Sequence, residues 1–212
     1  MILGMSVDWD NHDEICSSYE DNLNGQRLVA SKKVVEHEAA NIIRGNRTSL
    51  SQFVEKHSRD DFDNFGDLRN KLENFDRNSS SLVDYADHRK SKFSDFIAGD
   101  IDSIDLLELI DSDFDQPSMF IQKIKSGNSI IEYLNYSPSR HLSRYGSLYS
   151  RLANKVKNED DLEVLLDSHH LTEEENIDVA FLSFDKHDIT QNKDKIERTL
   201  SRVYVFNPSE HI

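Results

Sequence analysis

The chain has 212 residues, of which 36% are apolar and 31% are charged, and its formal net charge is −15. This length suits one hydrophobic core with an insertion, and the acidic excess excludes a uniformly basic surface for nucleic acids. The single cysteine, Cys16, excludes an intramolecular disulfide, and no stretch approaches the roughly 20 apolar residues of a membrane span. We therefore expect a soluble cytoplasmic protein without a membrane partner.

The first part of the chain alternates between apolar runs and helical spacing. Residues 1–7 (MILGMSV) form a continuous apolar run, which predicts a strand buried on both faces. Residues 11–23 carry apolar side chains at every fourth position and predict a helix. Residues 27–31 predict a second strand, and Ser31 is expected to cap a helix that ends near Gly45.

The middle of the chain, residues 46–157, predicts helices. Its apolar residues recur at three- and four-residue spacings, and no segment shows a convincing strand pattern. Turn-forming residues separate the helices at Gly66, Gly99, Pro117, Gly127 and Pro138. We therefore expect a helical insertion here.

The last part of the chain returns to alternating helices and strands. A helix beginning at Asp161 precedes the apolar run of residues 179–184, and a helix over 191–200 precedes a final strand over 203–206. Helices between strands imply right-handed crossovers onto one mostly parallel sheet.

These patterns predict an α/β fold in which a mostly parallel sheet is flanked by helices. We expect a single domain over residues 1–212. Its α/β core comprises residues 1–45 and 158–208, and residues 46–157 form the helical insertion.

Three acidic residues fall where parallel sheets bind ligands, beyond the carboxyl ends of strands or at adjacent helix starts. Glu38 lies in the helix after the second strand, Asp161 opens the helix before the third, and Asp185 follows that strand. Carboxylates from distant parts of a chain repel one another, and a hard divalent cation is the usual compensation. The trio therefore predicts a site for Mg²⁺ or Mn²⁺, with Asp167, and then Asp160, as alternatives to Asp161. The competing interpretation is that these acids are solvated surface groups, because the chain has 40 acidic residues.

Histidines accompany two of these acids. His169 and His170 follow Asp167, and His187 follows Asp185. Imidazoles bind transition metals, but no pair of histidines has the spacing of four that would place both on one helix face. We expect them to be surface residues or hydrogen-bonded residues of the core.

Several segments together resemble a PIN domain. They are SKKVVEHE at residues 31–38, DLEVLLDSHHL from Asp161, FLSFDKHDI at residues 181–189 and VYVFNP at residues 203–208. PIN domains are mostly metal-dependent ribonucleases, and many are toxins of prokaryotic toxin–antitoxin pairs. The resemblance covers about residues 1–45 and 158–208 and leaves the helical middle unmatched.

The resemblance implies a function for the acidic trio. Ser183-Phe184-Asp185 resembles the strand-end T-x-D motif of the family, with Ser in place of Thr. Glu38, Asp161 and Asp185 would then be the catalytic residues, with Mg²⁺ or Mn²⁺ as the cofactor and RNA as the substrate.

One position departs from the PIN pattern. The family has an Asp a few residues before a stretch like Ile2–Gly4, whereas this sequence begins at Met1, and Asp8 and Asp10 lie beyond the strand. Either this acid lies upstream or it has been lost, so we expect weak Mg²⁺ binding by the sequence as given. The second hypothesis is therefore a catalytically degenerate scaffold that binds proteins. A helical regulatory module without a site is the third.

A basic segment, residues 133–158, contains no acidic residue, and Tyr145 and Tyr149 stand between its basic residues. Its arginines and lysines are Arg140, Arg144, Arg151, Lys155 and Lys157. In so acidic a protein this composition predicts phosphate binding, and these residues are the expected RNA-binding surface. The alternative, which stays open, is that the tyrosines are core residues and the basic groups pair with acidic helices. The candidate partners are RNA, an antitoxin protein and a second copy of the chain.

Overall fold

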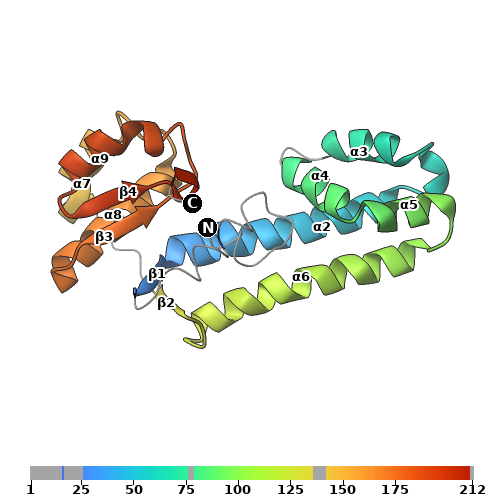
Figure 1. The fold of residues 1–212 in the computed structure, drawn as a ribbon, viewed down its shortest axis with the longest axis horizontal. Coiled ribbons are helices and arrows are strands. Elements are labelled where there is room, and N and C mark those ends of the chain that lie inside the picture. The colour runs from blue at the N-terminus through green and yellow to red at the C-terminus, as the bar shows by residue number, and fades with distance from the viewer. Residues whose placement is uncertain (1–15, 17–25, 76–78, 136–141, 211–212) are drawn as a thin grey trace. The chain divides into compact units, whose positions relative to one another are not determined.

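The structure, a computed structural model, describes residues 16, 26–75, 79–135 and 142–210 (Figure 1). The predicted strand at residues 1–7 lies outside the described residues, as does the predicted helix at 11–23 apart from Cys16. The chain divides into two compact units. The α/β unit includes Ile15–Glu38 and Ile124–Ile212, and the helical unit includes Ala39–Lys123. The helical unit thus begins and ends earlier than the expected insertion.

The strands of the α/β unit pair in parallel. β1 (Leu28–Ser31) pairs with β2 (Ile131–Leu134), and β3 (Val179–Leu182) pairs with β4 (Val203–Phe206). Parallel pairs joined through helices confirm a helix-rich α/β class. The expected single sheet is not seen among the described strands, which form two separate two-stranded sheets.

Strand β2 lies within residues 46–157, where the sequence predicted helices and showed no convincing strand pattern. The helix before it ends at Lys125, and the strand begins at Ile131, after the turn around Gly127. Gly127 has a φ of 75°, a left-handed conformation that glycine adopts at little cost. The four residues of β2 are too few for an alternating pattern to stand out from helical spacing.

The helix after β1 corrects a second prediction. It comprises the π-helix η1 (Lys33–Ala39) and α2 (Ala40–Lys56), so it does not end at Gly45. A glycine inside a helix costs only about 1 kcal/mol, and the apolar stripe beyond it is buried at Leu50 and Phe53. The expected cap is present, since the backbone N–H of Val34 donates to Ser31 Oγ at 3.5 Å.

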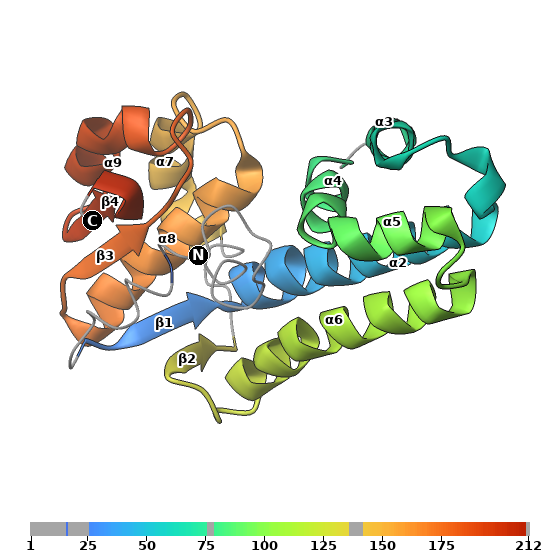
Figure 2. The same ribbon diagram turned by 45° about the vertical axis from the view of Figure 1, so that its right-hand side comes forward.

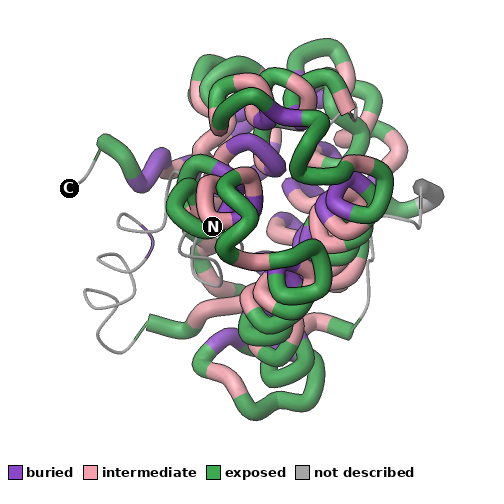
Figure 3. Tube along the Cα trace, turned by 90° about the vertical axis from the view of Figure 1, so that its right-hand side faces the viewer, coloured by how far each residue is buried: buried purple, intermediate pink, exposed green. Residues whose placement is uncertain are grey.

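The helical unit is built from short helices beside two longer ones (Figures 1 and 2). Besides α2 these are η2 (Arg59–Asp61), α3 (Phe65–Glu73), α4 (Ser79–His88), α5 (Lys90–Ala98) and α6 (Ser103–Lys125). Their apolar faces form its core, and Figure 3 shows buried residues as short segments along helices that are otherwise partly or fully exposed. Tyr85, fully buried, donates to Asp113, which also pairs with Arg89.

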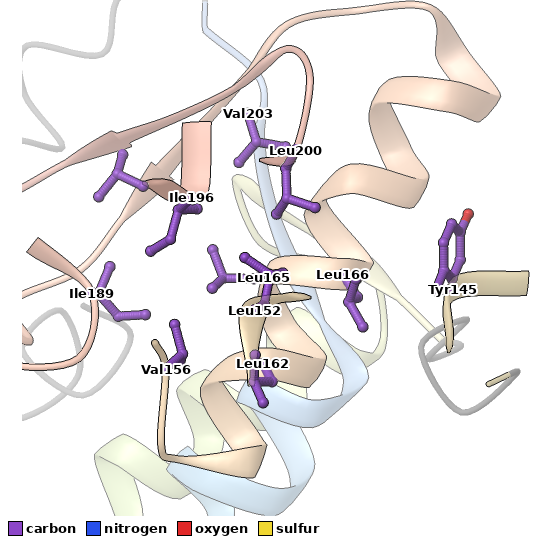
Figure 4. Close-up of a cluster of buried hydrophobic side chains, with 11 residues drawn as sticks. Tyr145, Leu152, Val156, Leu162, Leu165, Leu166, Ile189, Ile196, Leu200 and Val203 are labelled. Atoms are coloured by element: carbon purple, nitrogen blue, oxygen red, sulfur yellow. The ribbon is translucent and has the colours of Figure 1, made fainter. Parts of the chain in front are cut away.

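The core of the α/β unit lies between its helices and the β3–β4 pair (Figure 4). The helices are α7 (Leu142–Leu152), α8 (Glu159–Glu175), η4 (Thr190–Asn192), α9 (Lys193–Thr199) and η5 (Pro208–Glu210). Leu165 of α8, Ile196 of α9 and Val205 of β4 are fully buried in one apolar cluster. This cluster fixes the start of α8 and the loop after β3, where two of the predicted acids lie. No helix in the described part of the chain is long and apolar enough to span a membrane.

Candidate metal and nucleic-acid site

Glu38 lies in the π-helix η1, close to its end. In a π-helix residue i bonds residue i+5, so Glu38 and Lys33 lie on the same face. Segments of π-helix are rare and often accompany functional sites. The Lys33 ammonium favours the ionised form of Glu38 and is the main basic group near it in the described chain.

Asp161 lies in the first turn of α8, and its position is fixed by contacts on both sides of that turn. Asn158 caps the helix, accepting from the backbone N–H of Asp160 at 3.0 Å. Asp188 accepts from the backbone N–H groups of Lys157 and Asn158 at 2.8 and 2.9 Å. The start of α8 is therefore tied to the loop that follows β3.

Asp185 stands three residues beyond β3, at the carboxyl end of that strand. Its Oδ1 accepts from the backbone N–H groups of His187 and Asp188, both at 2.8 Å. Its backbone N–H donates to Ser183 Oγ at 3.1 Å, which gives Ser183 a local structural role. Within the described part of the chain, Asp185 Oδ2 accepts no hydrogen bond, so this oxygen is available to a ligand.

Electrostatic interactions link Asp161 with each of the other two predicted acids. The pKa of Glu38 is raised to about 6, first by burial and then by the nearby carboxylates of Asp161 and Asp160. The pKa of Asp161 is also raised to about 6, first by burial and then by Asp185, Asp188 and Asp160. Asp161 is therefore the member that connects the other two, since it raises the pKa of Glu38 and its own pKa is raised by Asp185. We call Glu38, Asp161 and Asp185 the acidic trio.

The donors of the acidic trio fit a hard cation, because carboxylate oxygens are the ligands that Mg²⁺ and Mn²⁺ prefer. Partly buried like charges without an equal number of cations are also the setting in which bound metal stabilises a protein. As the side chains are placed, however, no three acidic, histidine or cysteine groups of the described residues lie close enough to hold one ion. Binding would require the carboxylates to draw together.

The alternatives to Asp161 lie elsewhere. Asp167 is buried, at 2% exposure, and comes six residues later in α8, so it points about 120° around the helix from Asp161. It does not appear among the charges that act on Asp161. Asp160 is exposed and forms an ion pair of 2.6 Å with Lys33. The geometry favours Asp161 as the third acid.

The histidines show no metal-binding arrangement in the described chain. His170 Nδ1 lies 2.7 Å from the hydroxyl of Tyr145, and His169 Nε2 lies 3.4 Å from Glu173. Both rings are buried, and burial lowers the pKa of His170. His187 is exposed. These positions agree with the expectation of core and surface histidines.

The predicted RNA-binding residues divide into two groups. Arg144 is paired with Glu173 and Glu174 at 3.2 and 3.1 Å, and Tyr145 is buried, so the alternative interpretation holds for this part of α7. Arg140 lies outside the described residues. The remaining three are exposed and make no ion pair within the described part of the chain: Arg151, Lys155 and Lys157.

The backbone of two of these basic residues contacts the segment that follows Asp185. The backbone N–H of Lys157 donates to Asp188, one of the charges that raise the pKa of Asp161. The side chain of Asn192, which bonds the carbonyl of Asp188, also reaches the carbonyl of Lys155 at 3.4 Å. Lys155 and Lys157 thus come from a turn in contact with the loop of Asp185.

Sequence reasoning missed two residues of this region, Lys33 and Asp188. Asp188 had a signal, because it follows Asp185 by three residues and stands just before a helical turn. Lys33 had no such signal in the sequence, because residues five positions apart share a face in a π-helix but not in an α-helix.

Comparisons with known proteins give no relative: no family model, no curated protein and no solved structure matches this chain.

Removing the Asp161 charge should stabilise the protein above pH 6. A carboxyl whose pKa is higher in the folded chain holds more protons there, so the wild type loses stability as pH rises from about 4 to about 6. We expect Asp161→Asn to gain about 1 kcal/mol over wild type at pH 7, less than the full pKa shift implies, because water screens a partly exposed group. Urea unfolding at pH 4, 5, 6 and 7 measures this difference.

The matched control is Asp100→Asn, an exposed acid with no side-chain partner in the described chain. Its stability relative to wild type should stay level across the same pH range. An Asp161→Asn protein that is less stable than wild type at pH 7 would contradict the repulsion.

Proposed function

We propose that the protein is a metal-dependent endoribonuclease of the PIN type. The observation that supports this best is the coupling of Glu38, Asp161 and Asp185, three acids separated by up to 147 positions in the chain, each near the end of a strand or the start of a helix. Because the repulsion among these acids lowers the stability of the fold, their proximity indicates that they bind a ligand.

The residues have separable roles in this proposal. Glu38 and Asp161 hold the cation, and their partial burial restricts the access of bulk water to it. Asp185 offers Oδ2, while its Oδ1 is anchored by two backbone N–H groups that fix the carboxylate plane. When bound, Mg²⁺ or Mn²⁺ would lower the pKa of a water and neutralise charge on the scissile phosphate.

The choice of a polyanionic substrate is supported by Lys155 and Lys157. They are exposed and adjoin the loop of Asp185, although the whole chain carries a charge of −15. Exposed ammonium groups without acidic partners attract phosphates, and their counterions are released on binding. RNA rather than DNA follows from the PIN resemblance of the segments that carry the trio.

The alternative is a PIN-like scaffold that has lost activity and binds proteins. Two observations favour it: the described residues include no group of three ligands already placed for one ion, and Asp185 is partly engaged by its own loop. The two functions differ in whether metal and RNA are bound.

Cleavage of RNA tests the proposal. With Mn²⁺ present, the protein should cut a single-stranded RNA slowly, in line with the weak metal binding expected from its sequence. Asp161→Asn should reduce this rate at least about 100-fold, because the amide loses the charge that binds the cation. Asp100→Asn should retain the wild-type rate. Cleavage that survives Asp161→Asn would place the site elsewhere, and a wild type that neither cuts RNA nor binds Mn²⁺ would favour the scaffold.

Salt dependence tests the RNA-binding surface separately. The double variant Lys155→Gln/Lys157→Gln should bind single-stranded RNA more weakly and reduce the slope of log K against log salt concentration by about 1.4, or about 0.7 for each lost phosphate contact. Arg144→Gln is the control, because the charge of Arg144 is already paired with two glutamates. An equal loss in the control would show that the slope reports net charge and not these two lysines.

A further inference from the structure

Lys33 connects two segments that are 127 positions apart in the chain. Its ammonium lies 2.6 Å from Asp160 Oδ1 and 3.3 Å from Glu163 Oε2, both on the first turns of α8. Its side chain is only 12% exposed, whereas that of its neighbour Lys32 is 38% exposed. A lysine this buried is held by its partners, which distinguishes it from the solvated lysines of the surface.

Each of the two segments carries one member of the acidic trio. Lys33 opens η1, and Glu38 stands five residues later on the same face. Asp160 and Glu163 flank Asp161 on α8. The ion pairs of Lys33 therefore join the helix of Glu38 to the helix of Asp161.

This connection opposes a repulsion. Glu38 and Asp161 are partly buried like charges, and nothing in their own chemistry brings them together. Glu163 Oε2 is buried and makes no hydrogen bond of good geometry, so the charge of Lys33 at 3.3 Å is its compensation. Loss of Lys33 would leave this oxygen buried without a partner and release the first turn of α8 from η1.

We propose that Lys33 is a positioning residue, which holds the start of α8 against η1 so that Glu38 and Asp161 can bind the same divalent cation. This inference rests on the proposed metal site and adds a residue to it. Lys33 does not touch the cation. It acts through Asp160 and Glu163, as the outer partners of metal ligands commonly do.

Electrostatics and positioning predict opposite effects for removal of Lys33. As a mere positive charge near the site, Lys33 repels a cation, so Lys33→Gln would bind Mn²⁺ more tightly. As a positioning residue it brings the ligands together, so Lys33→Gln should bind Mn²⁺ about tenfold more weakly or worse. The sign of the change separates the two roles.

The experiment is a calorimetric titration of Mn²⁺ into the full chain for four proteins: wild type, Lys33→Gln, Lys33→Arg and Lys32→Gln. Arginine keeps the charge and can bridge Asp160 and Glu163, so Lys33→Arg should restore most of the affinity. Lys32→Gln removes the same charge one residue away, where Lys32 lies 3.8 Å from Glu36, and should bind no more weakly than wild type.

A charge-swapped double variant distinguishes loss of the ion pair from loss of folding as the cause of weaker Mn²⁺ binding by Lys33→Gln. Lys33→Glu combined with Asp160→Lys rebuilds the ion pair in reverse, so it should bind Mn²⁺ more tightly than Lys33→Glu alone. Equal or tighter binding by Lys33→Gln, or no gain from the swap, overturns the positioning role while the metal site stands. Absence of Mn²⁺ binding by wild type overturns the metal site itself, and the role of Lys33 with it.

Discussion

Repulsion among partly buried carboxylates is the constraint on which the candidate site depends. Glu38 and Asp161 have pKa values near 6 because burial and neighbouring acids disfavour their ionised forms. A protein gains no stability from such an arrangement, so the fold must hold these groups against their mutual repulsion. The hydrogen bonds and ion pairs around Glu38 and Asp161 hold the two carboxylates in place against this repulsion.

Local backbone structure supplies part of that restraint. The π-helix after β1 places Lys33 and Glu38 on one face, and the loop after β3 is closed by Asp185 and Asp188, which accept from backbone N–H groups. Asp188 also ties this loop to the start of α8. A basic turn, with Lys155 and Lys157, is joined to the same loop. Attraction of phosphate and attraction of a cation can therefore operate side by side in an acidic protein.

Sequence patterns predicted the parts of the fold that repeat over many residues. The helical character of the middle of the chain and the strand at residues 203–206 follow from apolar spacing and were found as expected. The expected break at Pro117 was wrong, because α6 continues through this residue, and α8 begins at Glu159, two residues before the predicted start. Strand β2 was missed because four residues are too few for a period, and the extension of α2 past Gly45 was missed because buried Leu50 and Phe53 outweigh one glycine. The expected strand at residues 1–7 and its place in a single sheet stay predictions.

For the site, position in an α/β pattern selected Glu38, Asp161 and Asp185, and their role in metal binding stays a prediction. Sequence could not decide which basic residues are available, because Arg144 is paired by glutamates of α8 that are 29 and 30 residues away. It also could not find Lys33, whose importance depends on a π-helix and on two partners in α8. Both the pairing of Arg144 and the role of Lys33 depend on contacts between segments that are distant in the sequence.

The most direct test of this account is a crystal structure of the protein grown with Mn²⁺, with anomalous scattering used to locate the metal. The account predicts an anomalous peak bounded by carboxylate oxygens of Glu38, Asp161 and Asp185, with Lys33 still paired to Asp160. Well-ordered trio side chains without a peak between them at millimolar Mn²⁺, or a peak only at other residues, would contradict it.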